Sequence, residues 1–206
     1  MKTQQFRAAA NTCHKTQTKN ANANNAATTK HINSKMSSST PQQQALDMNK
    51  IIDRIYLGCE EAACAPLEVL QGEFGITHIV TCGFGLLQPH LKSSKIQYHK
   101  INAIDLPVYN ILQHMDSCVQ FIDKALTENE TNCVLIHCQR GISRSAAITV
   151  GYLMKSKGMS FAEAYYGTAK KKRPCVKVNS AFQEQLELYE KMKCTLKGEL
   201  PAHKQY

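Results

Sequence analysis

Three common signatures are missing from this sequence of 206 residues, and each absence argues against a class of function. No two of its nine cysteines form a C-x-x-C pair, so zinc-ribbon spacing is absent. No apolar run approaches the roughly 20 residues that a membrane-spanning helix needs. The G-x-x-x-x-G-K-[ST] phosphate loop is also absent, which disfavours nucleotide binding of that kind.

Acidic residues are absent from residues 1–46, which are rich in Asn, Thr, Ala, Gln, Ser and Lys. Such a composition buries too little surface to offset its ordering entropy, so we expect a disordered, low-complexity tail over residues 1–47. Mitochondrial transit peptides share this lack of acids, but a single Arg and no apolar stripe make targeting the minor alternative. The first residues contain no apolar segment typical of a secretory signal. We therefore expect a cytoplasmic or nuclear protein, or both, with free thiols.

A net charge of +9 by itself is typical of nucleic-acid-binding proteins. Residues 1–47, however, hold six Lys or Arg and one acid, a net +5 that lies in the tail. Residues 48–206 hold nineteen bases and fifteen acids, an ordinary balance, so no nucleic-acid partner is expected. The run Lys170-Lys171-Lys172-Arg173 fits a nuclear import signal, but we expect it to be the solvated end of a helix.

From about Met48 the composition becomes that of a folded domain, which we place at residues 48–194. The apolar run Cys133-Val134-Leu135-Ile136-His137 suits a central strand covered on both faces. Strand and helix patterns alternate and then give way to helices, which predicts an α/β fold with a central, mostly parallel sheet flanked by helices. Residues 195–206 are expected to be a flexible C-terminal tail. Residues 53–58 are predicted to form a first strand and turn, and the later predicted strands are 76–82, 95–101 and 133–137. The predicted helices are 66–72, 111–127, 144–157, 160–173 and 180–194.

A short loop, His137-Cys138-Gln139-Arg140-Gly141-Ile142-Ser143-Arg144-Ser145, joins the central strand to the next helix. So short a loop turns its backbone N–H groups inward as an anion nest, at which the following helix points its positive end. Gly141 permits a turn that a side chain would obstruct. The Cys138 thiol should ionise there and attack phosphorus, while the Arg144 guanidinium can hold two phosphate oxygens. A lone cysteine is more often a small buried apolar residue, but these neighbours favour a nucleophile.

This loop resembles the His-Cys-x-x-Gly-x-Ser-Arg-Ser signature of the dual-specificity phosphatases, within the Cys-x5-Arg phosphatase superfamily. The resemblance implies a small Cys-dependent phosphatase fold and a cysteinyl-phosphate that water hydrolyses, with no metal and no cofactor. Val178 departs from the family pattern, which often has proline there. The flanking segments that also resemble the family are Ile55-Tyr56-Leu57-Gly58, Ala164-Tyr165, Arg173-Pro174, Asn179, Phe182 and Gln185-Leu186.

The family takes its leaving-group proton from an aspartate on a loop about thirty residues before the cysteine. Asp105 stands 33 residues before Cys138 and follows a predicted strand, so its loop should lie at the carboxyl edge of the sheet. By the same resemblance, the Ser145 hydroxyl bonds the sulfur and eases breakdown of the intermediate. The proposed catalytic residues are thus Cys138, Arg144, Asp105 and Ser145, and the rest of the phosphate-binding loop is His137, Gln139, Arg140, Gly141, Ile142 and Ser143.

The sequence contains no tryptophan, whereas tyrosine-specific relatives carry a Trp-Pro-Asp loop and a larger domain. We therefore expect a shallow cleft that accepts phosphoserine and phosphothreonine as well as phosphotyrosine, with phosphorylated proteins, including kinases, as partners. Arg140 stands where many relatives have alanine, so a phosphoinositide or RNA 5′-phosphatase on the same scaffold stays open. A phosphoprotein-binding pseudophosphatase is less favoured because Cys138, Arg144 and Asp105 are all present. The oligomeric state stays open.

Cys82 is a candidate redox partner of Cys138. It ends the predicted strand 76–82, which should run parallel to and beside the strand ending at His137, about 4.8 Å away. Some superfamily members with a cysteine at the matching strand end resemble this arrangement. The alternative, a plain buried apolar residue, is equally open at this point.

Overall fold

A computed structural model describes residues 46–93 and 95–196 of the chain. The predictions of a disordered N-terminal tail and of a mitochondrial transit peptide fall largely outside these residues, as does most of the predicted C-terminal tail. Among the described residues, no helix has both the length and the apolar character needed to cross a membrane.

The centre of the fold is a five-stranded sheet in the order β1-β2-β5-β3-β4. Three neighbouring pairs in it, β2 with β5, β5 with β3 and β3 with β4, are parallel, and only β1 runs antiparallel to its neighbour. The predicted α/β class with a mostly parallel sheet is therefore confirmed. The strands are β1 (Met48–Ile52), β2 (Ile55–Gly58), β3 (Ile76–Cys82), β4 (Gln97–Ile101) and β5 (Cys133–His137).

The start of the sheet differs from the sequence prediction, which placed the first strand, with a turn, within residues 53–58. Asp53 and Arg54 instead form the turn between β1 and β2, and Arg54 has a positive φ of 58°. β1 is held by its pairing with β2, in which Met48 lies opposite Gly58. The prediction missed β1 because this edge strand shows no strict alternation of apolar and polar residues.

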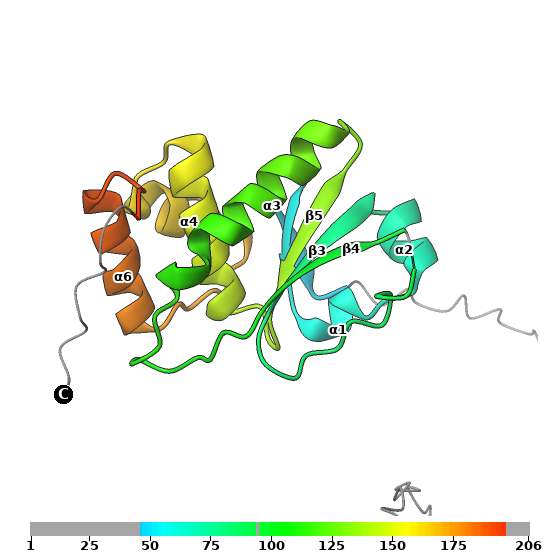
Figure 1. Ribbon diagram of the computed structural model, residues 1–206, viewed down its shortest axis with the longest axis horizontal. Coiled ribbons are helices and arrows are strands. Elements are labelled where there is room, and N and C mark those ends of the chain that lie inside the picture. The colour runs from blue at the N-terminus through cyan, green and yellow to red at the C-terminus, as the bar shows by residue number, and fades with distance from the viewer. Residues whose placement is uncertain (1–45, 94, 197–206) are drawn as a thin grey trace, which may run out of the picture. The chain divides into compact units, whose positions relative to one another are not determined.

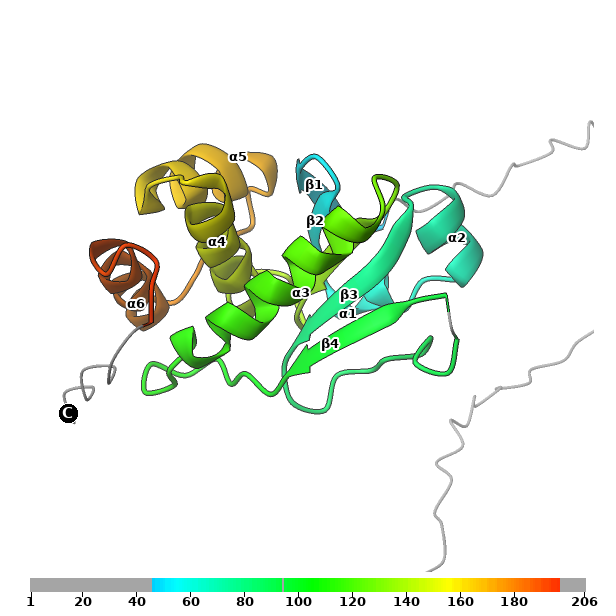
Figure 2. The ribbon, with the colours of Figure 1, turned by 45° about the horizontal axis from the view of Figure 1, so that its top comes forward.

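Helices cover both faces of the sheet (Figures 1 and 2). On one face, the larger core joins Val134 and Ile136 of β5 to α3, α4 and α6. On the other face, Leu135 belongs to a smaller core with Ala63 of α1 and Leu70 of α2. Alternate residues of β5 therefore enter opposite cores, as expected for a central strand. The helices are α1 (Glu60–Ala63), α2 (Leu67–Gly72), α3 (Met115–Glu128), α4 (Arg144–Lys157) and α6 (Ser180–Lys191).

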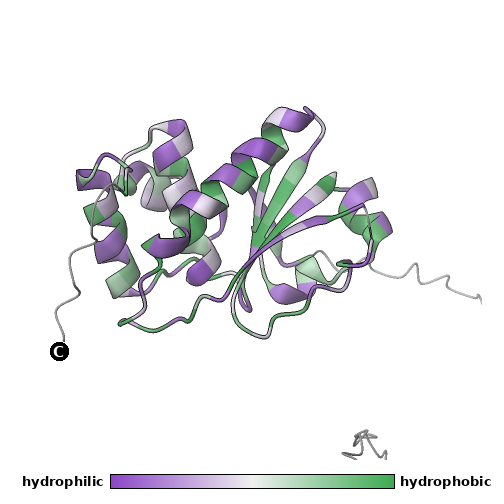
Figure 3. Ribbon diagram, in the orientation of Figure 1, coloured by the Kyte–Doolittle hydropathy of each residue, from purple (hydrophilic) through white to green (hydrophobic). Residues whose placement is uncertain are grey.

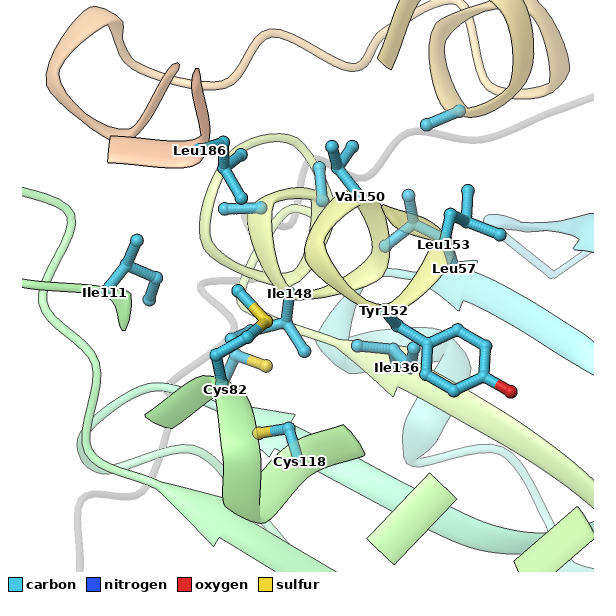
Figure 4. Close-up of a cluster of buried hydrophobic side chains, with 14 of the residues drawn as sticks. Leu57, Cys82, Ile111, Cys118, Ile136, Ile148, Val150, Tyr152, Leu153 and Leu186 are labelled. Carbon is cyan, nitrogen blue, oxygen red and sulfur yellow. The ribbon is translucent and has the colours of Figure 1, made fainter. Parts of the chain in front are cut away.

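Burial on all sides distinguishes α4 from the helices around it. Every residue from 145 to 154 is buried, and Figure 4 shows Ile148, Val150, Tyr152 and Leu153 of α4 among apolar side chains of the larger core. In contrast, Figure 3 shows hydrophilic and hydrophobic stripes alternating along α3, as expected for a helix with one face in water. A buried helix gives the loop before it a rigid support.

Two helical segments differ in detail from the sequence prediction. The helix predicted over 160–173 begins with the expected capping box, in which Glu163 N–H donates to Ser160 Oγ at 3.3 Å. It is then wound as a π-helix, η2 (Glu163–Ala169), and as the short α5 (Lys170–Lys172). A short 3₁₀ turn, η1 (Leu112–His114), precedes α3, and α6 ends at Lys191 rather than residue 194. Apolar spacing does not distinguish these windings, because each buries similar positions.

Candidate active site

The candidate site lies at the carboxyl edge of the sheet, where β5 ends and α4 begins. A cavity of about 550 Å³ opens there and is lined by Cys138, Arg144 and Asp105. Two predicted catalytic residues of one loop and a third, Asp105, which stands 33 residues before Cys138, thus face one space. The other lining residues are Arg140, Ile142, Ser143, Lys177, Val178, Asn179, Ser180 and Gln183.

The loop between β5 and α4 has its carbonyls held from outside. The Gln139 carbonyl accepts from the Glu60 N–H at 3.2 Å, and the Ile142 carbonyl accepts from the Lys177 N–H at 3.0 Å. In a planar trans peptide, the C=O of one residue and the N–H of the next point in opposite directions. Because the Gln139 and Ile142 carbonyls point out of the loop, the N–H groups of the residues that follow them point into it. Inward-facing N–H groups form an anion nest.

Gly141 lies at the sharpest point of this loop. Its φ is +66°, and a Cβ at this position would lie 2.4 Å from the Gly58 carbonyl oxygen. Both the backbone conformation and the close approach therefore require glycine here.

The Cys138 sulfur is buried at the base of the loop and accepts a hydrogen bond from Ser145 Oγ at 3.1 Å. Burial by itself would raise the pKa of the Cys138 thiol. Hydrogen bonds from the Ser145 side chain and from the backbone of Ser145 and Ile142, with the Arg144 charge, lower that pKa below its ordinary value. A thiol held in this way supplies a thiolate nucleophile more readily than free cysteine does.

Arg144 lies at the loop-to-helix junction beside the strand ends of β3 and β4. Its Nη1 donates to the Ala103 carbonyl at 3.4 Å, and Gly83 leaves room for the guanidinium, because a Cβ there would lie 2.7 Å from Nη1. Its Nε is buried and has no hydrogen-bond partner among the described residues. The planar Arg144 guanidinium thus keeps an N–H donor for an anion bound in the nest.

His137 anchors the end of β5 and carries no charge at neutral pH. Its Nε2 lies 2.9 Å from Thr81 Oγ1 on the neighbouring strand. Burial lowers the pKa of His137 to about 4. A neutral histidine tied to β3 fits the predicted anchoring role and not that of an acid or base at neutral pH.

Asp105 projects from the loop after β4 and is held through a single carboxylate oxygen. Its Oδ1 accepts from Ser143 Oγ at 2.8 Å and from Asn179 Nδ2 at 2.7 Å. Its Oδ2 has no hydrogen-bond partner among the described residues, so it is free to exchange a proton with a molecule in the cavity.

Asn179, Lys177 and Gln183 line the cavity but were not among the predicted site residues. For Asn179 the sequence favoured a structural role, since asparagine before a helix is a common N-cap. The structure shows this cap, because Asn179 Oδ1 accepts a hydrogen bond from the Phe182 N–H at 2.9 Å. Its second contact, with Asp105, spans 74 residues. Only the tertiary structure brings these two together.

The fold and the site together define the class of Cys-x5-Arg phosphatases: a thiol in an anion nest, an arginine six residues on, and an aspartate facing both. Among the described residues, no group of three or more His, Cys, Asp or Glu is arranged to hold a metal ion. The family model described as "Dual specificity phosphatase, catalytic domain" matches residues 55–192. The chain therefore belongs to the dual-specificity phosphatase family.

Comparisons with individual proteins agree with this membership. "Dual specificity protein phosphatase 19" of Mus musculus is 36% identical over 136 residues, which cover 66% of this chain and 59% of the relative. "MAP kinase phosphatase with leucine-rich repeats protein 2" of Dictyostelium discoideum is 38% identical over 149 residues, covering 72% of this chain and 20% of that protein. The chain thus spans less than two thirds of these relatives.

A solved structure also matches closely. The crystal structure of human tyrosine phosphatase-like serine/threonine/tyrosine-interacting protein aligns with a TM-score of 0.65 and 31% identity, covering 72% of this chain and 98% of that one. The predicted fold of a small Cys-dependent phosphatase is confirmed by this likeness.

Two buried cysteines flank Cys138: Cys82 is the last residue of β3, and Cys59 directly follows β2. Thr81 pairs with His137 across β3 and β5, so Cys82 lies beside Cys138. Gly58 pairs with His137 on the other side, so Cys59 is a second neighbour by register. Burial raises the pKa of Cys82 well above its ordinary value, with further increases from nearby Cys118 and Cys138. Figure 4 shows Cys82 and Cys118 in the larger core.

We expect mild peroxide to produce a reversible Cys82–Cys138 disulfide. The Cys138 thiolate is oxidised to sulfenic acid as peroxide is reduced, and the Cys82 thiol then displaces water to form the S–S bond. Peptide mapping after oxidation should find this pair, and Cys82→Ala should lose most of the activity that wild type recovers in dithiothreitol. Cys59→Ala is the matched control and should recover as wild type does. Full recovery by Cys82→Ala, or a mapped Cys59–Cys138 bond, would refute the pairing.

Proposed function

We propose that this chain hydrolyses the phosphate esters of protein tyrosine, serine and threonine through a cysteinyl-phosphate intermediate. The observation that carries the proposal is a single cavity in which the Cys138 thiol, with a lowered pKa, faces both Arg144 and Asp105. A nucleophile, an anion-binding fork and a proton donor are the three parts that phosphoester cleavage by covalent catalysis requires.

In the first step, the Cys138 thiolate attacks phosphorus, an S–P bond forms and the bond from phosphorus to the leaving oxygen breaks. The loop N–H groups and the Arg144 fork bind the equatorial oxygens as charge spreads over them. Asp105, protonated on Oδ2, gives its proton to the departing alcohol, so no alkoxide is released. The bonds from Ser143 and Asn179 to Oδ1 keep the acid in place.

In the second step, water attacks the phosphorus of the intermediate and the S–P bond breaks. The Asp105 carboxylate takes a proton from this water and is ready for the next cycle. The Ser145 hydroxyl, 3.1 Å from the sulfur, stabilises the departing thiolate by a hydrogen bond. Phosphate then leaves the nest.

Phosphorylated proteins are the substrates that family membership favours. Within that class, the Dictyostelium relative is named as a MAP kinase phosphatase, which supports phosphorylated kinase segments as candidates. A second candidate, a phosphoinositide or RNA 5′-phosphate, is favoured by a different observation. Arg140 and Lys177 line the cavity with exposed side chains and add positive charge at its mouth.

Direct comparison of substrates tests the proposal. Phosphotyrosine and phosphothreonine peptides are expected to be hydrolysed with kcat/KM at least about tenfold above that for phosphoinositide in vesicles. Phosphate release is the readout, and Cys138→Ser protein is the blank. Faster release from the vesicles, or from a 5′-triphosphorylated RNA, would move the assignment to the second candidate. If the protein hydrolysed none of these substrates, the remaining assignment would be a phosphoprotein-binding protein without phosphatase activity.

A further inference from the structure

We propose that Arg173 is a positioning residue that holds the phosphate loop in its active shape from outside the cavity. The preceding residues Lys170, Lys171 and Lys172 are exposed, as expected for a solvated helix end, but Arg173 is only 2% exposed. The prediction that the whole basic run is solvated was therefore wrong for its last member. A buried guanidinium is costly unless every donor is used, so its partners indicate its role.

The Arg173 fork bonds two consecutive carbonyls of the loop. Its Nε donates to the Gly141 carbonyl at 3.0 Å, and its Nη2 donates to the Arg140 carbonyl at 3.2 Å. With the bonds from Glu60 and Lys177 described above, the carbonyls from residue 139 to residue 142 are all held from outside the nest.

These bonds set the direction of the neighbouring amides. Because the peptides that follow Arg140 and Gly141 have their carbonyls turned toward Arg173, their N–H groups, on Gly141 and Ile142, point the opposite way. The Ile142 backbone is one of the groups that lowers the pKa of the Cys138 thiol. Arg173 therefore acts on the nucleophile through the Gly141–Ile142 peptide, without touching the sulfur.

The other end of the fork is tied to the start of the sheet. Nη1 of Arg173 donates to Asp47 Oδ1 at 2.7 Å and to Asn49 Oδ1 at 2.8 Å. The Asp47 carboxylate compensates the buried charge, and its hydrogen bond with Arg173 lowers the pKa of Asp47. Lysine could not replace this arrangement, since one ammonium cannot span two carbonyls and two side-chain oxygens as a planar fork does.

Arg173 does not line the cavity that holds Cys138. It lines a separate cavity of about 510 Å³ on the outer side of the loop, with Asp47, Cys59 and Cys175 among its walls. A phosphate bound over Cys138 therefore has other residues, and not Arg173, as its surroundings. The contribution of Arg173 is to the shape of the loop, and it is not a catalytic residue.

The first test is the pH profile of Cys138 alkylation by iodoacetamide in the full-length chain, followed by peptide mapping. Arg173→Lys keeps the charge but loses the fork, so alkylation should begin at a pH at least half a unit above that of wild type. Lys172→Ala is the matched control and should follow the wild-type profile. An Arg173→Lys protein that remains folded by thermal denaturation and keeps the wild-type profile would overturn the proposal.

Asp47→Ala keeps the test decisive should Arg173→Lys fail to fold. Asp47 is exposed and binds the Arg173 fork, whose charge it compensates, without replacing the bonds from the fork to the loop carbonyls. Its loss should therefore shift the alkylation profile in the same direction by a smaller amount. An unchanged profile in this variant would then count against the proposal.

The effect on turnover rests on the proposed function. Arg173→Lys should lower kcat/KM for p-nitrophenyl phosphate by about 10 to 100-fold, because small misplacement of reacting groups costs that much. The loss should lessen as pH rises and the thiolate is restored, whereas general loss of folded protein would lower the rate equally at every pH. If wild type turned over no phosphoester, the proposed function would fail, but the alkylation profile would still decide the role of Arg173.

Discussion

Replacing Cys138 by serine should abolish turnover of every phosphoester and leave anion binding by the loop intact. A serine hydroxyl is far less acidic than a thiol, so the nest that ionises Cys138 leaves serine protonated and weakly nucleophilic. We expect kcat to fall by more than about 10³-fold. Steady-state release of p-nitrophenol measures the loss, and protection against thermal unfolding by tungstate measures the anion binding that remains.

Cys133→Ser is the control for this variant, since Cys133 begins β5, at the end of the strand far from Cys138. It should keep near wild-type kcat. Retention of more than a few per cent of the rate by Cys138→Ser would contradict the covalent mechanism. Loss of tungstate protection would show that the sulfur, and not the backbone nest, dominates anion binding.

Replacing Asp105 by asparagine should separate substrates by their leaving groups. An alkyl leaving group such as that of phosphoserine needs a proton as its bond to phosphorus breaks, whereas p-nitrophenolate leaves without one. We therefore expect kcat/KM for phosphoserine and phosphothreonine peptides to fall by about 10² to 10⁴-fold. The fall for p-nitrophenyl phosphate should be at least about tenfold smaller.

Asparagine is a suitable replacement because its amide oxygen can still accept the bonds that Ser143 and Asn179 give to Oδ1. The loop should therefore keep its position while the acid is lost. Asp116→Asn is the matched control, because Asp116 lies in the first turn of α3 and bonds Lys155 at the surface. Equal losses on alkyl and aryl substrates would place the proton donor elsewhere.

Much of the fold could be predicted from local pattern. The strand from Cys133 to His137 was predicted to the residue, because an apolar run of this length bounded by polar residues has few alternatives. The helix from Arg144 to Lys157 also matched, since Gly158 after it adopts the left-handed conformation of a helix C-cap. β1 was missed, because an edge strand depends more on its partner than on its own residues.

The sequence by itself determined the chemical identity of the site. A strand, a cysteine, a short glycine-containing loop, an arginine and a helix are consecutive in the chain, so neighbouring residues specify an anion nest around a thiol. Periodicity also determined that parallel strand ends would gather at one edge.

Only the tertiary structure decided what holds that site in shape. Asp105 meets Asn179 across 74 residues, and Arg173 meets Gly141 across 32. No local pattern records such contacts, because they depend on how the sheet and helices close around a common core. The basic run at residues 170–173 shows the difference. Composition predicted four solvated cations, but packing buries Arg173 against the loop. Only the assembled fold offers the carbonyls and the carboxylate that the Arg173 guanidinium binds.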